Sequence, residues 1–543
     1  MNFFAKLILL ISILLSSCNA AYGDGPSKES VLATMKTSSR FMMEKVSYQG
    51  GFVWAYLPDF SRQWGELEAR RSMIWLQPPG TASVGHVLLD AYHATSDDYY
   101  YQAAEQVAGA IMHAQLPNGG WNYVADFAGE ASLRDWYNTI GKNAWRLEEF
   151  QYYSDNATFD DGGTMDAATF LLRMYTEKSD KKYRPALTKA IDFVLQSQYP
   201  IGGWPQRYPP SKSQPHKGVA DYASFITFND DVADKNMEFL LMCYQSLNKK
   251  FIDEVRVLDA ISRGMNAYVV LQLKQPQPGW SMQYDAKFLP EGARSFEPKS
   301  VSTSTTVDNI LQLIKFYRLT GDRKFLTPIP AALDWLETTK LPTHEINNNR
   351  NHAGNVEVGT GRFLYTHRRG SNEVNGEYYA DYNATKTLAH YGSTCRINIA
   401  SLRAAYAEAL ALSPEKLAKN SSLKNTKKEP LPIYFSFKQC NNSDLNLRGK
   451  NAMSGAQKVQ DLVSTLNPQG YWPTPLLMTS NPYKGEPPKT EFSKDERYAE
   501  TLVGDEWDTS PYISDQPPLG ISAGVYIKNM SVLISYLNEQ QNQ

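Results

Sequence analysis

The sequence predicts an all-α fold: an α/α toroid built from three to six repeated αα-hairpins, with long loops at one end forming a cleft. Two segments that end in Gly-Gly-Trp, residues 92–121 and 175–204, match each other position by position. Each segment holds two stretches of apolar residues at helical spacing, joined by a short polar turn. Agreement at so many positions indicates a repeat architecture.

The two copies share residue types at fixed distances from their closing tryptophans. The matching pairs are Gln115 and Gln198, Ala103 and Ala186, Tyr100 and Tyr183, Asp97 and Asp180, and Tyr92 and Tyr175. Each copy turns at a Gly-Gly pair, because glycine adopts positive φ without steric cost. The first two hairpins of the toroid therefore lie in these copies.

Weaker copies of the repeat extend the pattern along the chain. Residues 310–336 keep its register, and residues 232–275 predict another hairpin that ends at Gly279-Trp280. We expect a fifth hairpin from residues 396–411 and 456–466, which end at Gly470-Tyr471-Trp472.

The first and last predicted helices have no neighbour in the chain with which to form a hairpin. The first spans about residues 29–46 and the last about residues 521–537. We expect these two helices to pair with each other and to close the ring.

Composition sets broad limits on function. The chain has 543 residues, 42% of them hydrophobic and 21% charged, with a formal net charge of −2. These values are typical of a globular protein and argue against general nucleic-acid binding, which requires a basic surface. Aromatic residues make up 12%, which suits a carbohydrate-binding cleft, although such rings also fill helix–helix contacts. We expect a monomer.

The N-terminal residues have the features of an export signal. Residues 1–17 combine one lysine with a short apolar run, and Leu15-Ser16-Ser17-Cys18 is similar to a bacterial lipobox. An ordinary signal peptide with an incidental Cys18 is the alternative. Residues 18–27 then form a linker and residues 28–543 the toroid domain. We expect a secreted protein or a periplasmic or outer-membrane lipoprotein, with membrane contact only through this anchor.

Three other cysteines follow Cys18. Cys243 lies in an apolar helix and is expected to be a buried thiol. Cys395 and Cys440 would be able to pair in an oxidising compartment, and the sequence leaves that pairing open.

Three polar clusters fall on long loops at hairpin ends, and such loops are usually functional. They are Asp160-Asp161, Asn229-Asp230-Asp231, and a third that contains Arg294. Each acidic pair precedes a helix, where helix capping is the alternative role. Acidic pairs at the same end of consecutive hairpins point to one cleft, and clustered carboxylates favour a bound Ca²⁺. For Arg294, the alternative is a structural salt bridge with Glu291 or Glu297.

The region from about residue 152 to 342 resembles the pectate lyases of polysaccharide lyase family ten, the pectic acid lyase family. Four motifs carry the resemblance, in the family's order and approximate spacing. They are Thr158-Phe159-Asp160-Asp161, Gln198-Tyr199-Pro200-Ile201-Gly202-Gly203-Trp204-Pro205-Gln206, Ile226-Thr227-Phe228-Asn229-Asp230-Asp231 and Ala293-Arg294-Ser295-Phe296-Glu297.

The resemblance implies an α/α toroid that cleaves polygalacturonate or a related acidic polysaccharide by Ca²⁺-dependent β-elimination. Asp160 and Asp230 match acidic residues around the family's calcium ion. Asp161 stands where the family usually has Asn, a change that calcium can tolerate because both side chains present oxygen. Arg294 matches the arginine proposed as the base that removes the C5 proton.

The resemblance also indicates substrate-binding residues. Arg362 resembles a downstream arginine that binds substrate in the family. Trp204, Gln206 and Asn229 lie within the matching motifs, and we expect them to contact the polysaccharide.

Two other functions fit the same residues. An inverting glycoside hydrolase on an (α/α)6 barrel would use two carboxylates, for example Asp160 and Asp230, with a water molecule between them. A non-catalytic glycan-binding lipoprotein would keep the toroid and the aromatic residues without turnover.

Overall fold

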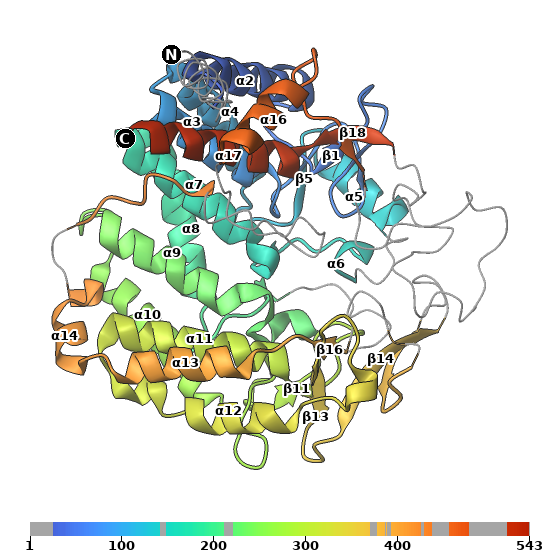
Figure 1. Cartoon of the computed structure of the whole chain (residues 1–543), viewed down its shortest axis with the longest axis vertical. Helices are drawn as coiled ribbons and strands as arrows, with labels where there is room; N and C mark the ends of the chain where they lie inside the picture. Colours follow the sequence, from blue (N-terminus) through green and yellow to red (C-terminus); the bar gives the residue numbers. More distant parts are fainter. Residues whose placement is uncertain are drawn as a thin grey trace, which may run out of the picture.

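The computed structural model describes residues 25–141, 148–210, 221–369, 377–385, 387, 393–424, 428–436, 455–476 and 518–541. Its helices are stacked along the long axis of the molecule (Figure 1). The α-helices are α2 (Lys28–Phe41), α3 (Thr81–Thr95), α4 (Asp98–Ala114), α5 (Glu130–Thr139), α6 (Glu148–Gln151), α7 (Gly163–Lys178), α8 (Arg184–Ser197), α9 (Val232–Ser246), α10 (Glu254–Val270), α11 (Thr303–Thr320), α12 (Ile329–Thr338), α13 (Ile399–Leu410), α14 (Pro414–Lys419), α16 (Ala456–Thr465) and α17 (Ala523–Gln541).

Consecutive helices pair as αα-hairpins. The pairs α3–α4, α7–α8, α9–α10 and α11–α12 pack against each other, and α3 also packs on α7, which packs on α9. These pairs confirm the four hairpins predicted from residues 92–121, 175–204, 232–275 and 310–336. The predicted fold class, an all-α toroid of repeated hairpins, is confirmed.

The repeated glutamine joins one hairpin to the next. The side-chain Nε2 of Gln115 donates to Gly119 O at 2.8 Å and to Ala186 O, in the following hairpin, at 2.9 Å. Gln198 makes the equivalent two bonds, each at 2.8 Å. The glutamine recurs in the sequence because each corner needs the same link between hairpins.

The first glycine of each corner lies against the next hairpin. Gly119 has φ +101°, and a Cβ there would stand 2.3 Å from Lys189 O. Gly202 has φ +108°, and a Cβ there would stand 2.0 Å from Arg263 O. Both the backbone conformation and the close approach therefore require glycine.

The terminal helices pair as predicted. α2 packs against α17, and Ser39 Oγ lies 2.8 Å from Tyr526 Oη across their contact. α17 also packs on α3, so the pair adds a layer to one end of the stack. α12 and α13 lie at the opposite end of the long axis (Figure 1). The described part of the toroid is therefore open, and the expected ring closure is wrong.

The predicted fifth hairpin is also wrong. α13 packs against α11 and α12, whereas α16 packs against α2 and α17 at the other end of the molecule (Figure 1). The buried residues of α13, Ile399, Leu402 and Ala409, form a short apolar stripe that serves the contacts with α11 and α12. The corner after α16 follows the repeat instead, with Gly470 beside Thr37 O of α2.

The long loops carry short strands on one side of the helix stack (Figure 1). The strands are β1 (Ala55–Tyr56), β2 (Gln63–Trp64), β3 (Glu68–Ala69), β4 (Met73–Trp75), β5 (Val124–Asp126), β6 (Ala157–Thr158), β7 (Arg207–Tyr208), β8 (Ile226–Thr227), β9 (Gln283–Tyr284), β10 (Pro290–Glu291), β11 (Ser300–Ser302), β12 (His352–Ala353), β13 (Asn355–Glu357), β14 (Phe363–Arg369), β15 (Glu377–Asp381), β16 (Thr394–Cys395), β17 (Thr474–Pro475) and β18 (Leu519–Ser522). Two of the sheets, β6–β7 and β10–β9–β8, hold the loops that carry the predicted site.

Some sequence predictions fall outside the described residues, namely the signal peptide with Cys18 and the partner cysteine Cys440. Cys243 is buried, as predicted. None of the described helices is both long enough and apolar enough to cross a membrane.

Candidate active site

Two turns with the same backbone shape carry the predicted carboxylates. In each, a two-residue strand leads to a buried phenylalanine, then to a turn and a helix: β6 precedes the Asp160–Gly162 turn and α7, and β8 precedes the Asn229–Asp231 turn and α9. Gly162 lies close to α9, since a Cβ at this position would stand 2.8 Å from Cδ of Lys235 on that helix. The two turns therefore lie side by side at the starts of neighbouring helices.

Both turns contain residues in the left-handed region. Asp161 has φ +49°, and Asp230 and Asp231 have φ +55° and +57°. The left-handed conformation costs about 1–2 kcal/mol per residue outside glycine, least for Asn and Asp. Strain of this kind is concentrated at functional sites. The helix N-termini that follow also place partial positive charge near the carboxylates.

The three predicted metal ligands converge. One carboxylate oxygen from each of Asp160, Asp161 and Asp230 lies within 4.8 Å of the others. Asp160 is buried, whereas Asp161 and Asp230 are partly exposed. The predicted convergence of Asp160, Asp161 and Asp230 is confirmed, and their role as metal ligands stays a prediction.

Neighbouring side chains orient two of these carboxylates. Tyr123 Oη donates a hydrogen bond to Asp160 Oδ2. Gln77 Nε2 donates to Asp161 Oδ2, and Gln77 Oε1 in turn accepts from Trp75 Nε1 at 3.0 Å. These partners come from two earlier loops of the toroid, so four segments of the chain meet at the acidic cluster.

Arg294 enters the same cluster and is enclosed by carboxylates. Its Nε and Nη2 donate to Glu297 at 2.8 and 2.9 Å, and its Nη1 donates to Glu149 at 2.6 Å. Nη2 also lies 3.1 Å from Asp230 Oδ2, and Nη1 lies 3.5 Å from Asp160 Oδ2. The side chain of Arg294 is only 5% exposed. It therefore contacts both Glu297, as the structural alternative required, and the predicted metal ligands.

The site has a surplus of negative charge. Four carboxylates, those of Glu149, Asp160, Asp230 and Glu297, lie beside the guanidinium of Arg294, and Asp161 adds a fifth to the acidic cluster. Burial, and then the charge of Asp160, raise the pKa of Asp230 well above its ordinary value. Burial also raises the pKa of Glu149. Such a cluster needs protons or a cation to be stable.

The donor set fits a hard divalent cation. Asp160 Oδ1 and Asn229 Oδ1 are buried and have no hydrogen-bond partner among the described residues. Asn229 Nδ2 donates to Asp230 Oδ2 at 2.5 Å, which turns the amide toward the acidic cluster. Carboxylate and amide oxygens are the ligands that Ca²⁺ prefers. Asp160, Asp161 and Asp230 are the residues that would hold the ion.

The structure corrects the role predicted for Trp204. Its side chain is fully buried, and its Nε1 donates to Val194 O at 2.9 Å in the hairpin corner. Trp121 makes the equivalent bond to Ile111 O at 2.8 Å. A ring without exposed surface cannot stack on a sugar, so the tryptophan of this motif serves the corner of the repeat.

Gln206 and Arg362 lie in different surroundings. Gln206 is buried, its carbonyl accepts from Phe159 N at 2.9 Å, and its side-chain amide has no hydrogen-bond partner among the described residues. Arg362 is exposed between β13 and β14, with its guanidinium 3.1 Å from the ring centroid of Tyr382. Substrate binding by Gln206, Asn229 and Arg362 stays a prediction.

Sequence reasoning did not find Glu149, Tyr123 or Gln77. Tyr123 follows the repeated Trp121 by two residues, as Gln206 follows Trp204. The two copies differ at this position, so the repeat itself gives no signal for Tyr123. Glu149 lies in the four-residue helix α6 and has no such signal.

The arrangement suits proton removal near a bound cation. Arg294 Nη2 lies beside Asp230, a candidate metal ligand, so a substrate carboxylate held there would bring its neighbouring C–H group near the guanidine. One carboxylate oxygen of Asp160 lies within 4.8 Å of one of Asp230, close enough for both to reach a single cation.

Comparisons with known proteins agree with the motifs. Residues 131–371 match the family model described as pectic acid lyase, a wider region than the one that carries the motifs. No curated protein sequence matches the chain.

Solved structures show weaker similarity. A family 10 polysaccharide lyase from Cellvibrio cellulosa has 20% sequence identity and a TM-score of 0.41, covering 60% of this chain and 98% of that chain. A mutant of that enzyme in complex with trigalaturonic acid has 19% identity and a TM-score of 0.40, covering 61% and 99%. An unsaturated glucuronyl hydrolase specific for heparin has 9% identity and a TM-score of 0.36, covering 95% and 99%. The similarity to the pectic acid lyase family therefore rests on the match over residues 131–371.

Proposed function

We propose that this chain is a pectate lyase that cleaves polygalacturonate by Ca²⁺-dependent β-elimination, since its residues 131–371 match the family model described as pectic acid lyase. One observation carries the proposal beyond the family match. A buried arginine, Arg294, lies 3.1 Å from Asp230, whose carboxylate converges with those of Asp160 and Asp161. The candidate base and the candidate cation ligands therefore form one site.

The chemistry follows from the charges. Asp160, Asp161 and Asp230 would hold Ca²⁺, whose positive charge would attract the uronate carboxylate and make the C5 proton beside it more acidic. Arg294 accepts that proton, the C4–O bond breaks, and the electron pair of the C5–H bond forms the C4–C5 double bond. The leaving oxygen departs with the C4–O electrons and takes a proton from solvent.

The surroundings of Arg294 explain why cation binding and base function are coupled. A guanidinium ordinarily has a pKa above about 12, and adjacent carboxylates favour its charged form. Asp160 and Asp230, two of the four carboxylates beside Arg294, are also candidate cation ligands. Neutralisation of their charge weakens the contacts that keep Arg294 protonated, so the residue is a better base in the loaded site.

An ultraviolet assay tests the proposal. The C4–C5 double bond of an elimination product is conjugated with the uronate carboxylate and absorbs ultraviolet light, whereas hydrolysis makes no such chromophore. We expect polygalacturonate to give this absorbance with Ca²⁺ and to give none after chelation. New reducing ends without absorbance would favour the glycoside hydrolase. Binding without chain cleavage would favour the non-catalytic glycan-binding protein.

We also propose export with a lipid on Cys18, on the basis of the apolar run and the lipobox-like Leu15-Ser16-Ser17-Cys18. Radiolabelled palmitate should be incorporated into the wild-type protein and not into Cys18→Ala. Equal labelling of the two proteins would exclude this anchor.

A further inference from the structure

Glu149 contacts Arg294 from a distant part of the chain. Its Oε1 accepts from Arg294 Nη1 at 2.6 Å, and its side chain is 3% exposed. The two residues are 145 positions apart, and Glu149 belongs to α6, which lies outside the repeated hairpins. The contact therefore joins a separate loop to the site.

The contacts around the guanidinium fix its direction. Glu297 accepts hydrogen bonds from Nε and Nη2, and Glu149 accepts one from Nη1. The edge formed by Nη1 and Nη2 then faces Asp160 and Asp230, at 3.5 and 3.1 Å. Glu149 and Glu297 fix the orientation of the guanidinium plane. Asp160 and Asp230 are candidate cation ligands, so their contacts with Arg294 would weaken when a cation binds.

We propose that Glu149 is a positioning residue for Arg294: it keeps Nη1 in place when Asp160 and Asp230 bind a cation. Without Glu149, the Nη1 side of Arg294 would lose this carboxylate contact, whereas Nε and Nη2 would keep theirs to Glu297. The inference rests on the proposed lyase function, in which the nitrogen that accepts the C5 proton must stay directed at the bound substrate.

Phe150, which follows Glu149 in the chain, packs α6 into an aromatic cluster. The Phe150 ring packs against three aromatic residues, with centroid distances of 5.1 Å to Tyr123, 5.6 Å to Trp75 and 6.0 Å to Trp136. Tyr123 also donates to Asp160. The same aromatic cluster therefore sets the position of Glu149 and of one candidate cation ligand.

The ion pair with Arg294 does not account for the whole of the buried Glu149 carboxylate. Glu149 adds a negative charge to a site that already has a surplus, and its Oε2 is buried without a hydrogen-bond partner among the described residues. A buried polar atom without a partner opposes folding and calls for a functional explanation. Holding Arg294 from the side opposite Glu297 supplies one.

The test compares Glu149→Gln and Glu149→Asp with the wild-type enzyme, measuring kcat and KM on polygalacturonate, thermal unfolding and Ca²⁺ binding by calorimetry. Gln keeps the shape but weakens the bond to the guanidinium, and Asp keeps the charge but withdraws it by one methylene. We expect kcat to fall about 100-fold in both variants, the usual effect of misplacing a reacting group by about 1 Å. KM and Ca²⁺ affinity should stay within about threefold.

Glu291→Gln is the matched control, because Glu291 lies in the same loop as Arg294 and forms an exposed ion pair with Lys299 at 2.9 Å. This variant should keep wild-type kcat. A folded Glu149→Gln with kcat within threefold of wild type, or full rescue by Asp, would overturn the inference. Failure of both variants to fold would overturn it as well, since Glu149 would then serve the fold. Absence of lyase activity in the wild type would instead contradict the proposed function.

Discussion

Two buried arginines of this molecule differ in the number of carboxylates that lie beside them. Arg173, 4% exposed, faces one carboxylate, with its Nη2 2.8 Å from Asp90 Oδ1, and otherwise donates to neutral groups such as Ile433 O at 2.9 Å. Arg294, 5% exposed, faces four carboxylates beside a candidate metal site. Burial alone therefore does not distinguish the two arginines, but the balance of nearby charge does.

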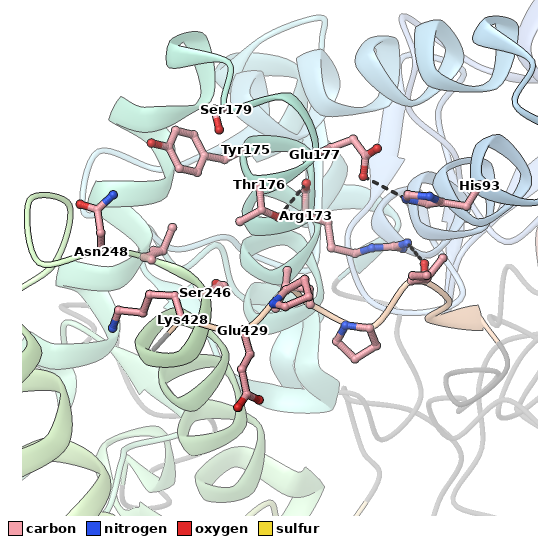
Figure 2. Close-up of a pocket in the computed structure, with 15 residues that line it drawn as sticks. His93, Arg173, Tyr175, Thr176, Glu177, Ser179, Ser246, Asn248, Lys428 and Glu429 are labelled. Atoms are coloured by element: carbon pink, nitrogen blue, oxygen red, sulfur yellow. Dashed lines mark hydrogen bonds and ion pairs between the residues drawn. The ribbon is translucent and has the colours of Figure 1, made fainter. Parts of the chain in front are cut away.

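The two arginines also lie at opposite ends of the same helices. Arg173 borders a pocket of about 410 Å³ at the C-terminal ends of α7 and α9, and Figure 2 shows its guanidinium directed at the segment that crosses them. Asp90, its partner, also accepts from the backbone N–H of Phe435 and Ser436. Arg173 thus anchors a crossing segment, whereas Arg294 lies where α7 and α9 begin.

The largest expected effect is on turnover in Arg294→Lys. A lysine cannot keep contacts with Glu149, Glu297 and Asp230 at once, because an ammonium lacks the planar fork of the guanidinium. We expect kcat to fall by about 10²–10⁴, the usual contribution of a general base. KM should change little. Initial rates and the melting temperature should be measured together; a folded variant with near-normal kcat would remove Arg294 from the mechanism.

Arg173→Leu should show the opposite pattern. Removal of one partner from a buried ion pair costs about 3–5 kcal/mol, because Asp90 would keep a buried charge without its cation. We expect urea unfolding to show a loss of this size. The kcat of the folded fraction should stay at the wild-type value, and a fall in kcat at full stability would contradict the assigned structural role.

Calcium removal should affect stability in a pH-dependent way. The raised pKa of Asp230 means that the folded, cation-free protein binds a proton that the unfolded chain releases. Its stability should therefore fall as pH rises from about 3.9, the ordinary aspartate pKa, toward the raised pKa. Ca²⁺ competes with that proton, so its stabilising effect should grow over the same pH range.

Thermal unfolding with and without Ca²⁺ across this pH range measures the effect. At a free Ca²⁺ concentration of about 100 times Kd, the gain should approach 2.7 kcal/mol. The control is Asp230→Asn, which should lose most of the pH-dependent gain. An equal Ca²⁺ effect at every pH would argue against Asp230 as a ligand.

The smallest expected effect is that of Asp161→Asn. Asn keeps one side-chain oxygen, replaces the other with an amide nitrogen that cannot accept from Gln77, and removes one negative charge from a site with a surplus. We expect Ca²⁺ affinity to fall by less than about tenfold, since affinity depends on the number of charged ligands. Activity at saturating Ca²⁺ should persist. Calorimetry should measure the Ca²⁺ affinity of Asp161→Asn and of Asp160→Asn. The second variant changes a buried ligand and should lose far more affinity.

Local patterns in the sequence were sufficient for the hairpins and the carboxylates. Helical periodicity and the Gly-Gly-Trp corners depend on neighbouring residues, so residues 92–121 and 175–204 were read correctly. Asp160 and Asp230 were found because each occupies the turn before a helix, and equivalent turns of adjacent hairpins lie side by side. The resemblance in four motifs then pointed to Arg294.

The tertiary structure alone decided the remaining features. The burial of Trp204, the separation of α13 from α16 and the contact of Glu149 with Arg294 depend on how hairpins stack across long separations in the chain. No periodic pattern encodes a contact between residues 145 positions apart, because it arises from the summed geometry of the intervening elements. The charge surplus around Arg294 is likewise a property of packing, which brings side chains from separate loops into one buried site.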